Sequence, residues 1–173
     1  VYTVCAAGAE VERCKGGLMR LCLKQHLFTW GDRFTVYDEN GNDAYYVEGE
    51  VLTWGKKLHI LSLSGEELLF ISQKVWSFRP RYELLRSGQV TACVERQFSF
   101  LQSHYLVDGF GWDVEGDFFN HEYVILAGTL QVAQVSKEWF TWGDTYTIDF
   151  IPTVRPEDVL AVVLAIDACL ANN

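Results

Sequence analysis

The chain has 173 residues and a mass of 19.8 kDa, which fits one ordinary domain. Hydrophobic residues make up 49% and charged residues 21%, so the composition excludes a disordered or collagen-like chain and indicates a real core. The net charge of −9 argues against nucleic acid or an anionic membrane surface as a general partner.

The first 18 residues differ from the remainder of the chain. They show no strand or helix periodicity, and the only methionine, Met19, stands directly before the patterned region. We therefore expect residues 1–18 to be a disordered or non-native N-terminal extension, with the domain spanning residues 19–173. A short natural tail before an internal methionine is the alternative.

The cysteine pattern indicates a reducing compartment. The number of cysteines is odd, their spacing is irregular and no C-x-x-C occurs, which is poor support for a disulfide framework or a zinc site. The N-terminal stretch lacks the basic start and apolar run of a signal peptide, and no run reaches the ~20 apolar residues of a transmembrane segment. These features predict a cytoplasmic protein with reduced thiols at Cys5, Cys14, Cys22, Cys93 and Cys169.

An internal repeat organises residues 21–151. A block of apolar, Ser or Thr, and aromatic residues recurs at intervals of 20 to 24 residues, as in Leu52-Thr53-Trp54 and Trp76-Ser77-Phe78. The serine and threonine at its centre have the pattern of strand residues. After each block comes a short alternating segment, then in most units a glycine turn such as Asn40-Gly41 and a second strand. Six such hairpins predict a mainly β fold of about twelve antiparallel strands, as a sandwich or a closed barrel.

The last part of the chain predicts a helix of another kind. Pro156 suits the first helical position, and residues 159–171 are apolar on every side except at Asp167. A helix over about 156–171 would be about 24 Å long, too short for the ~30 Å core of a bilayer. Since a twelve-stranded barrel is too wide to be filled by its own side chains, we expect this hydrophobic helix to run through the barrel.

Five segments of the chain resemble, in the same order along the sequence, the bacterial branch of the LURP-one-related family. This family belongs to the tubby C-terminal-like superfamily. The segments cover residues 27–50, 55–60, 111–125, 137–150 and 161–171. The resemblance implies a twelve-stranded barrel around a central C-terminal helix, in agreement with the pattern of the residues. Tubby-like domains bind phosphoinositides and the related scramblases act at membranes, but the family offers no catalytic residues that could be carried over to this chain.

The segment from Lys74 to Arg96 is the candidate anion site. It holds five basic residues against Glu83 and Glu95, for a net charge of +3 inside an acidic protein. Arginine binds phosphate and carboxylate through paired hydrogen bonds, so Lys74, Arg79 and Arg81 are the candidate binding residues. Solvated strand edges, where basic residues oppose aggregation, are the alternative interpretation.

Asp167 is the other residue of interest, because it is the one ionisable group in the buried helix. A buried carboxylate needs a partner or a raised pKa. We expect a structural pairing near the mouth of the barrel, with a proton or ligand site as the alternative.

No other motif indicates chemistry. The four histidines fall in different repeat units, the acidic turn at 38–43 lacks the spacing of an EF-hand, and no G-x-S-x-G occurs. The sequence therefore predicts no catalytic residues, no metal and no cofactor.

The favoured hypothesis is a non-enzymatic binding or scaffold module whose ligand, a protein or a lipid, and whose oligomeric state are unknown. The alternatives are a membrane-associated phospholipid-binding or scramblase-like protein, and an enzyme whose site is assembled only in the fold.

Overall fold

The computed structural model describes residues 17–24, 33–51, 53–98, 103–140 and 143–171. Within these ranges the chain forms twelve strands followed by one helix, as the sequence predicts. The strands are β1 (Met19–Lys24), β2 (Arg33–Asp38), β3 (Asp43–Gly49), β4 (Lys57–Leu61), β5 (Glu67–Gln73), β6 (Arg81–Arg86), β7 (Gln89–Phe98), β8 (Ser103–Asp108), β9 (Trp112–Asp117), β10 (Glu122–Ala127), β11 (Leu130–Phe140) and β12 (Gly143–Phe150). The helix α1 spans Pro156–Leu170.

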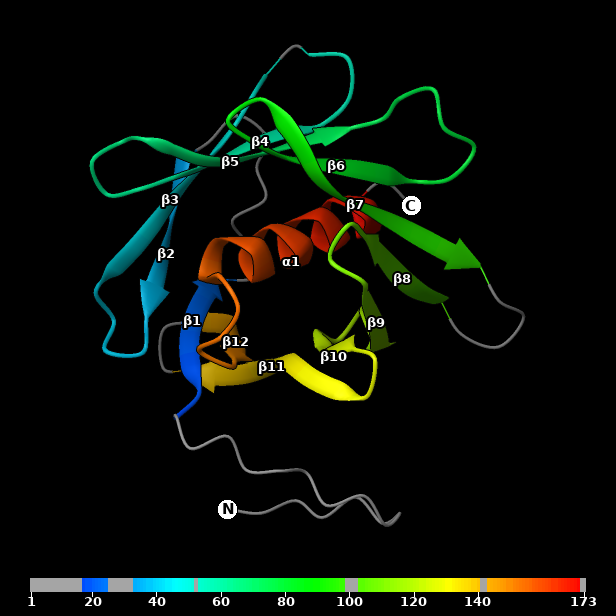
Figure 1. Cartoon of the computed structure of the whole chain (residues 1–173). Coiled ribbons are helices and arrows are strands. Elements are labelled where there is room, and N and C mark those ends of the chain that lie inside the picture. The colour runs from blue at the N-terminus through cyan, green and yellow to red at the C-terminus, as the bar shows by residue number, and fades with distance from the viewer. Residues whose placement is uncertain (1–16, 25–32, 52, 99–102, 141–142, 172–173) are drawn as a thin grey trace.

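The strands form a closed antiparallel barrel in which every strand pairs with its neighbours in sequence. Closure comes from β1, which pairs with β12 over six residues, from Met19 opposite Phe150 to Lys24 opposite Thr145. Figure 1 shows the strands surrounding α1. The barrel predicted from the repeat is thus confirmed, and closure gives each of the twelve described strands a partner on both sides.

Alternation of side chains along each strand separates a core from a solvated surface. In β2, for example, Phe34 and Val36 are buried and their neighbours are not, and in β4 the same holds for Leu58 and Ile60. The inward residues of all strands pack on the helix in a single apolar cluster.

Tight turns connect the hairpins at one end of the barrel. At the first of them Asp38 accepts hydrogen bonds from the backbone N–H groups of Asn40 and Asn42, and Gly41 has φ +81°. Only glycine adopts that φ readily, so the Asn-Gly pair fixes the turn.

The helix is buried along nearly its whole length. All residues from Val159 to Cys169 are buried, which confirms the expected central position. Its first turn is tied to the wall by Arg86, whose guanidinium donates to Glu157 at 3.1 Å and to Asp158 at 2.5 Å. Among the described residues, no helix has both the length and the apolar character needed to cross a membrane.

The end of the barrel at which α1 finishes is called here the C-terminal mouth. The connections 50–56, 74–80 and 118–121 lie at this end, opposite the tight hairpin turns. Thr53 and Ser77 lie in these connections, so the prediction that they are strand residues is wrong. The other block centres, Thr29, Ser99 and Thr141, lie outside the described residues. Hydrophobicity alone does not distinguish a strand from a protruding loop.

Candidate functional site

A set of inward-facing tyrosines lies near the C-terminal mouth. One buried position near the start of alternate strands is Phe or Leu in β2 and β4 and Tyr in β6, β8, β10 and β12. All six are buried: Phe34, Leu58, Tyr82, Tyr105, Tyr123 and Tyr146. The barrel therefore carries hydroxyl groups into its core where aliphatic residues would have sufficed.

Asp167, in the last turn of α1, is the centre of a buried polar cluster. The Tyr146 hydroxyl donates to its Oδ2 at 2.5 Å, and His121 Nε2 lies 3.3 Å from its Oδ1. The His121 ring also stacks on Tyr146, with centroids 4.5 Å apart. Asp167 therefore has one hydrogen-bond partner, from β12, at Oδ2, while its Oδ1 faces the His121 ring of the 118–121 connection.

Three more aromatic rings extend this cluster. Phe118 packs edge-on against Tyr105, with ring centroids 4.8 Å apart, and at a tilt against Tyr123, with centroids 5.1 Å apart. Burial raises the pKa of both tyrosines, and the charge of Asp167 raises it further. Neither hydroxyl has a hydrogen-bond partner among the described residues.

The polar atoms without a hydrogen-bond partner are the unusual feature of this cluster. They are fully buried and come from β8, β10, the 118–121 connection and α1: Tyr105 Oη, Tyr123 Oη, His121 Nδ1 and Asp167 Oδ1. His121 also adopts φ +54°, a left-handed conformation that is uncommon for residues other than glycine. These residues are called below the mouth cluster: Tyr105, Phe118, His121, Tyr123, Tyr146 and Asp167.

Two basic residues lie beside the mouth cluster. Arg96 is buried in β7 directly opposite Tyr105 in β8, and the Nζ of Lys56 donates to the Ala168 carbonyl at 3.3 Å. Burial lowers the pKa of Lys56 to about 8. Burial also raises the pKa of the Cys169 thiol to about 12, although the charges of Arg96 and Lys56 oppose this shift. Cys169 is therefore a protonated thiol at neutral pH, unlike an activated nucleophile.

The residues of the candidate anion site lie on the outer surface near β5, β6 and β7, each beside a carboxylate. Lys74 Nζ is 2.9 Å from Glu83, and Arg79 donates to Gln97 at 2.7 Å and to Glu95 at 3.5 Å.

Arg81 lies 3.9 Å from the same Glu95 and donates from Nε to Cys93 Sγ at 2.7 Å. The structure brings Lys74, Arg79 and Arg81 to one region, and their role as an anion site stays a prediction. Arg86 lies elsewhere, at the end of β6 against the first turn of α1, and Arg96 is buried inside the barrel.

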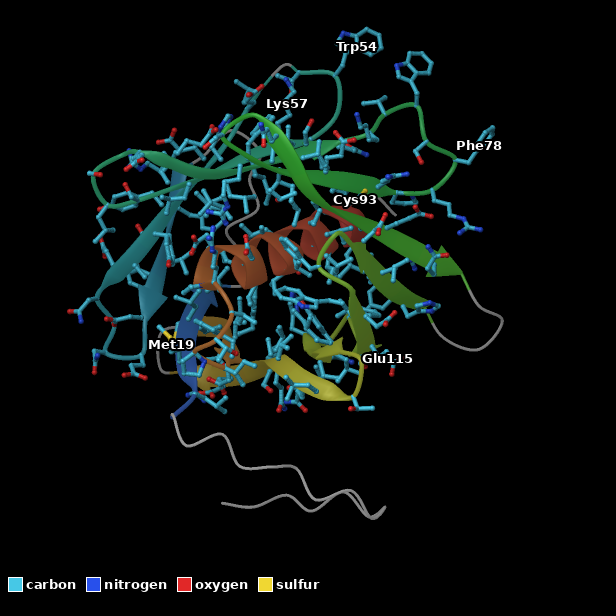
Figure 2. The ribbon with its side chains drawn as sticks, in the orientation of Figure 1. Met19, Trp54, Lys57, Phe78, Cys93 and Glu115 are labelled. Atoms are coloured by element: carbon cyan, nitrogen blue, oxygen red, sulfur yellow. The ribbon has the colours of Figure 1, made fainter. Side chains whose placement is uncertain are left out.

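A separate apolar surface covers the adjacent connections 50–56 and 74–80. Trp54 is 85% exposed, Trp76 is 94% exposed and Phe78 is fully exposed. Figure 2 shows Trp54 and Phe78 projecting away from the barrel. With the exposed Val51 and Val75, these three aromatic residues are called below the aromatic surface.

The two connections of the aromatic surface are held together. Lys56 and Gln73 exchange two hydrogen bonds of 2.9 Å, one from each backbone N–H. Gly55 has φ +81°, and a Cβ there would lie 2.6 Å from Val75, so glycine permits the close approach. The aromatic side chains are thus presented from one supported platform.

Sequence reasoning identified Asp167 but neither the tyrosines nor the aromatic surface. The signal for the tyrosines was present, since Tyr replaces Phe or Leu at one position of the repeat. For the aromatic surface, the hydrophobicity of the recurring apolar–Ser/Thr–aromatic block indicated burial. The sequence therefore contained no signal that these side chains are exposed. Among the described residues, no group of three or more His, Cys, Asp or Glu side chains could hold a metal ion.

Comparison with known proteins agrees with this architecture. The family model described as LURP-one-related matches residues 19–167. The uncharacterised protein YxjI of Bacillus subtilis (strain 168) is 31% identical over 159 residues, covering 90% of this chain and 96% of YxjI. A protein from Arabidopsis thaliana with an X-ray structure shares the fold, with a TM-score of 0.66 and 18% identity over 91% of this chain and 93% of that one.

Proposed function

The chain belongs to the LURP-one-related family, and on this basis we propose that it is a non-enzymatic binding module that docks a partner protein through its aromatic surface. The proposal includes a cytoplasmic location, supported by the free thiols of Cys22, Cys93 and Cys169 among the described residues.

The exposure of Trp54, Trp76 and Phe78 is the observation that carries the proposal. Large aromatic side chains lose favourable burial when they remain in water, and a contiguous apolar patch on a soluble domain usually marks an interaction site. Trp, Phe and Arg are enriched in protein interfaces, and Trp and Arg dominate their binding energy. Arg79 lies next to Phe78 in the sequence and supplies the polar rim.

The charges around the aromatic surface favour a protein over an anionic membrane. Lys74 is paired with Glu83, and Arg79 and Arg81 share Glu95, so little of their charge is left for lipid headgroups. The net charge of −9 opposes approach to an anionic bilayer. An apolar centre with balanced charges at its rim is the usual pattern of a protein interface.

The groups inside the barrel support a role without catalysis. The Asp167 carboxylate is held by Tyr146 in a short hydrogen bond, and the Cys169 thiol stays protonated at neutral pH. Neither is arranged as a nucleophile with an adjacent base.

The test begins with cross-linking and affinity capture from cells, followed by titration of the purified partner against the full chain by calorimetry. Changing Trp76 and Phe78 together to Ser should weaken binding at least tenfold, about 1.4 kcal/mol. Leu130→Ser is the matched control, because Leu130 is also exposed but lies in the distant β10–β11 hairpin. A captured protein whose affinity does not depend on Trp76 and Phe78 would contradict the proposal.

The same aromatic residues next to Lys74 and Arg79 could enter a membrane interface, which is the second candidate function. Flotation with neutral phosphatidylcholine vesicles separates the two. Vesicle binding that is lost in the Trp76→Ser/Phe78→Ser variant would replace the protein partner by a lipid surface.

A further inference from the structure

We propose that the mouth cluster binds a small zwitterion of the amino acid class, with its amine at Asp167 and its carboxylate toward Arg96. This inference concerns the interior of the barrel and does not depend on the aromatic surface or on its partner.

The first argument is the set of four buried atoms without a hydrogen-bond partner. Leaving a buried polar group unsatisfied costs about 1–3 kcal/mol, and native proteins contain few of them. In the mouth cluster they are the hydroxyls of Tyr105 and Tyr123, Nδ1 of His121 and Oδ1 of Asp167. A bound molecule with several polar atoms would satisfy these groups together.

The second argument is the charge on the two sides of the cluster. Asp167 is negative and lies against Tyr146 and His121. Arg96 is positive and lies opposite Tyr105 in the β7–β8 register. Lys56 is also positive, and its Nζ donates to the carbonyl of Ala168, the residue after Asp167 in α1.

This charge arrangement discriminates between ligand classes. A simple anion would be repelled by Asp167, and a simple cation by Arg96 and Lys56. A zwitterion matches both signs, and its net charge of zero avoids transferring an unbalanced charge into the core. The role of Arg96 in this argument is its charge, together with its position across from Tyr105.

The third argument is the aromatic surroundings of the carboxylate. Tyr105, Phe118 and Tyr123 form a linked group of rings, and Tyr146 lies directly against Asp167. Ammonium groups are attracted to aromatic faces, most strongly where water is excluded. Asp167 also lies near the C-terminal end of α1, whose last turn holds no basic residue, so the partial negative charge of the helix end favours an amine there.

The experiment uses the purified full chain, dialysed after partial unfolding to remove any co-purified molecule. Each of the standard amino acids is tested by thermal shift and then by calorimetry. We expect at least one to bind saturably, and its N-acetyl and carboxamide derivatives, each lacking one charge, to bind at least tenfold more weakly.

Two variants connect binding to the mouth cluster. Asp167→Asn keeps an acceptor for Tyr146 and should weaken binding at least tenfold. Tyr123→Phe removes a hydroxyl that has no partner in the protein, so the fold should keep its stability while affinity falls several-fold. The control is Tyr45→Phe, since Tyr45 lies near Glu157 at the other end of α1 and should bind as the wild type does.

Several results would overturn the proposal. These are no saturable binding of any amino acid, equal affinity for the singly charged derivatives, and unchanged affinity in Tyr123→Phe. A crystal structure grown with the tested amino acids that holds only ordered water between Tyr105, Tyr123 and Asp167 would do the same. Loss of partner binding in the Trp76→Ser/Phe78→Ser variant bears only on the proposed function, because these two side chains are exposed outside the barrel whereas Tyr105, Tyr123 and Asp167 are buried inside it.

Discussion

Tyr146 donates a 2.5 Å hydrogen bond to Asp167 and so joins β12 to the last turn of the central helix. Both residues are buried, and the bond is one in which a neutral hydroxyl meets a charged carboxylate. Bonds of this kind are stronger than those between neutral groups, and they have the greatest effect where water cannot replace a lost partner. The pair ties the C-terminal end of α1 to the wall, as Arg86 ties its first turn.

Tyr146→Phe should lower the free energy of unfolding by about 1.5–3 kcal/mol, the value of a hydrogen bond to a charged group. The ring remains and fills the same space, so the loss reports the hydroxyl alone. Tyr123→Phe is the control: its hydroxyl has no partner in the protein, and its removal should cost nothing measurable. Urea denaturation of the dialysed protein measures both, and equal losses in the two variants would contradict this account of Asp167.

Arg86→Ala should destabilise the protein by about 1–3 kcal/mol, because it leaves Glu157 and Asp158 partly buried without their cation. Arg86→Lys should recover only part of this loss, since lysine cannot place two nitrogens on two carboxylates. Arg79→Ala removes an exposed arginine and should stay within about 0.5 kcal/mol. The urea midpoints of the three variants measure these differences. If Arg86→Ala leaves the free energy of unfolding unchanged, the start of α1 is held by packing alone.

Much of the fold could be predicted because its signals are local and repeated. The Asn40-Gly41 turn, the alternation of Phe34 and Val36, and the apolar circumference of residues 159–169 each specify one element. The position of the helix inside the barrel could also be predicted, because the apolar helix is too short to cross a bilayer and a twelve-stranded barrel is too wide to be filled by its own side chains.

The site could be predicted only in part, for two physical reasons. Periodicity shows that Tyr105 and Tyr123 face inward, but their meeting with His121 and Asp167 depends on the stagger of the strands and the depth of the helix. Likewise, hydrophobicity cannot tell that Trp76 and Phe78 project from a connection, since the same residues would suit a buried strand.

The stability of the protein should rise with pH between about 8 and 10.5 through Lys56. Its pKa is lowered to about 8 by burial, from 10.5, so in this interval the unfolded chain binds the proton that the folded chain has lost. Stability therefore increases with pH there, by at most about 1.4 kcal/mol per unit and less because Lys56 is only partly buried.

The measurement is the difference between wild type and Lys56→Met in urea unfolding at a series of pH values. This difference removes the opposing contribution of Cys169, whose raised pKa weakens the fold above about pH 9. A difference that stays constant from pH 7 to 10.5 would be incompatible with a buried, easily deprotonated Lys56.

Leu164→Asp should abolish folding. Leu164 is in the middle of α1 and fully buried, so a carboxylate there would have no water, and an unpaired buried charge costs several kcal/mol. That is comparable with the whole stability of a domain. Leu106→Asp places the same charge on the outer face of β8, where Leu106 is exposed, and should fold. Circular dichroism and size-exclusion chromatography show whether each variant folds. A folded Leu164→Asp variant would mean that the helix can leave the barrel.

The protein should not bind phosphoinositide vesicles strongly at physiological salt, in contrast to what its resemblance to tubby-like domains implies. Lys74, Arg79 and Arg81 are beside Glu83 and Glu95, so a phosphate would have to displace existing carboxylate partners. The field of the basic residues is screened beyond ~8–10 Å, while the net charge of −9 opposes approach to the bilayer.

Co-sedimentation with vesicles that contain or lack phosphoinositide tests this prediction, on the wild type and on Arg79→Glu/Arg81→Glu. The paired variant Glu83→Gln/Glu95→Gln sharpens it, because freeing the three basic residues from their carboxylates should create weak binding that the wild type lacks. Because the aromatic surface is intact in all these proteins, any binding that requires phosphoinositide reports the basic residues. Tight binding by the wild type that is lost in Arg79→Glu/Arg81→Glu would place an anion site on these residues despite their partners.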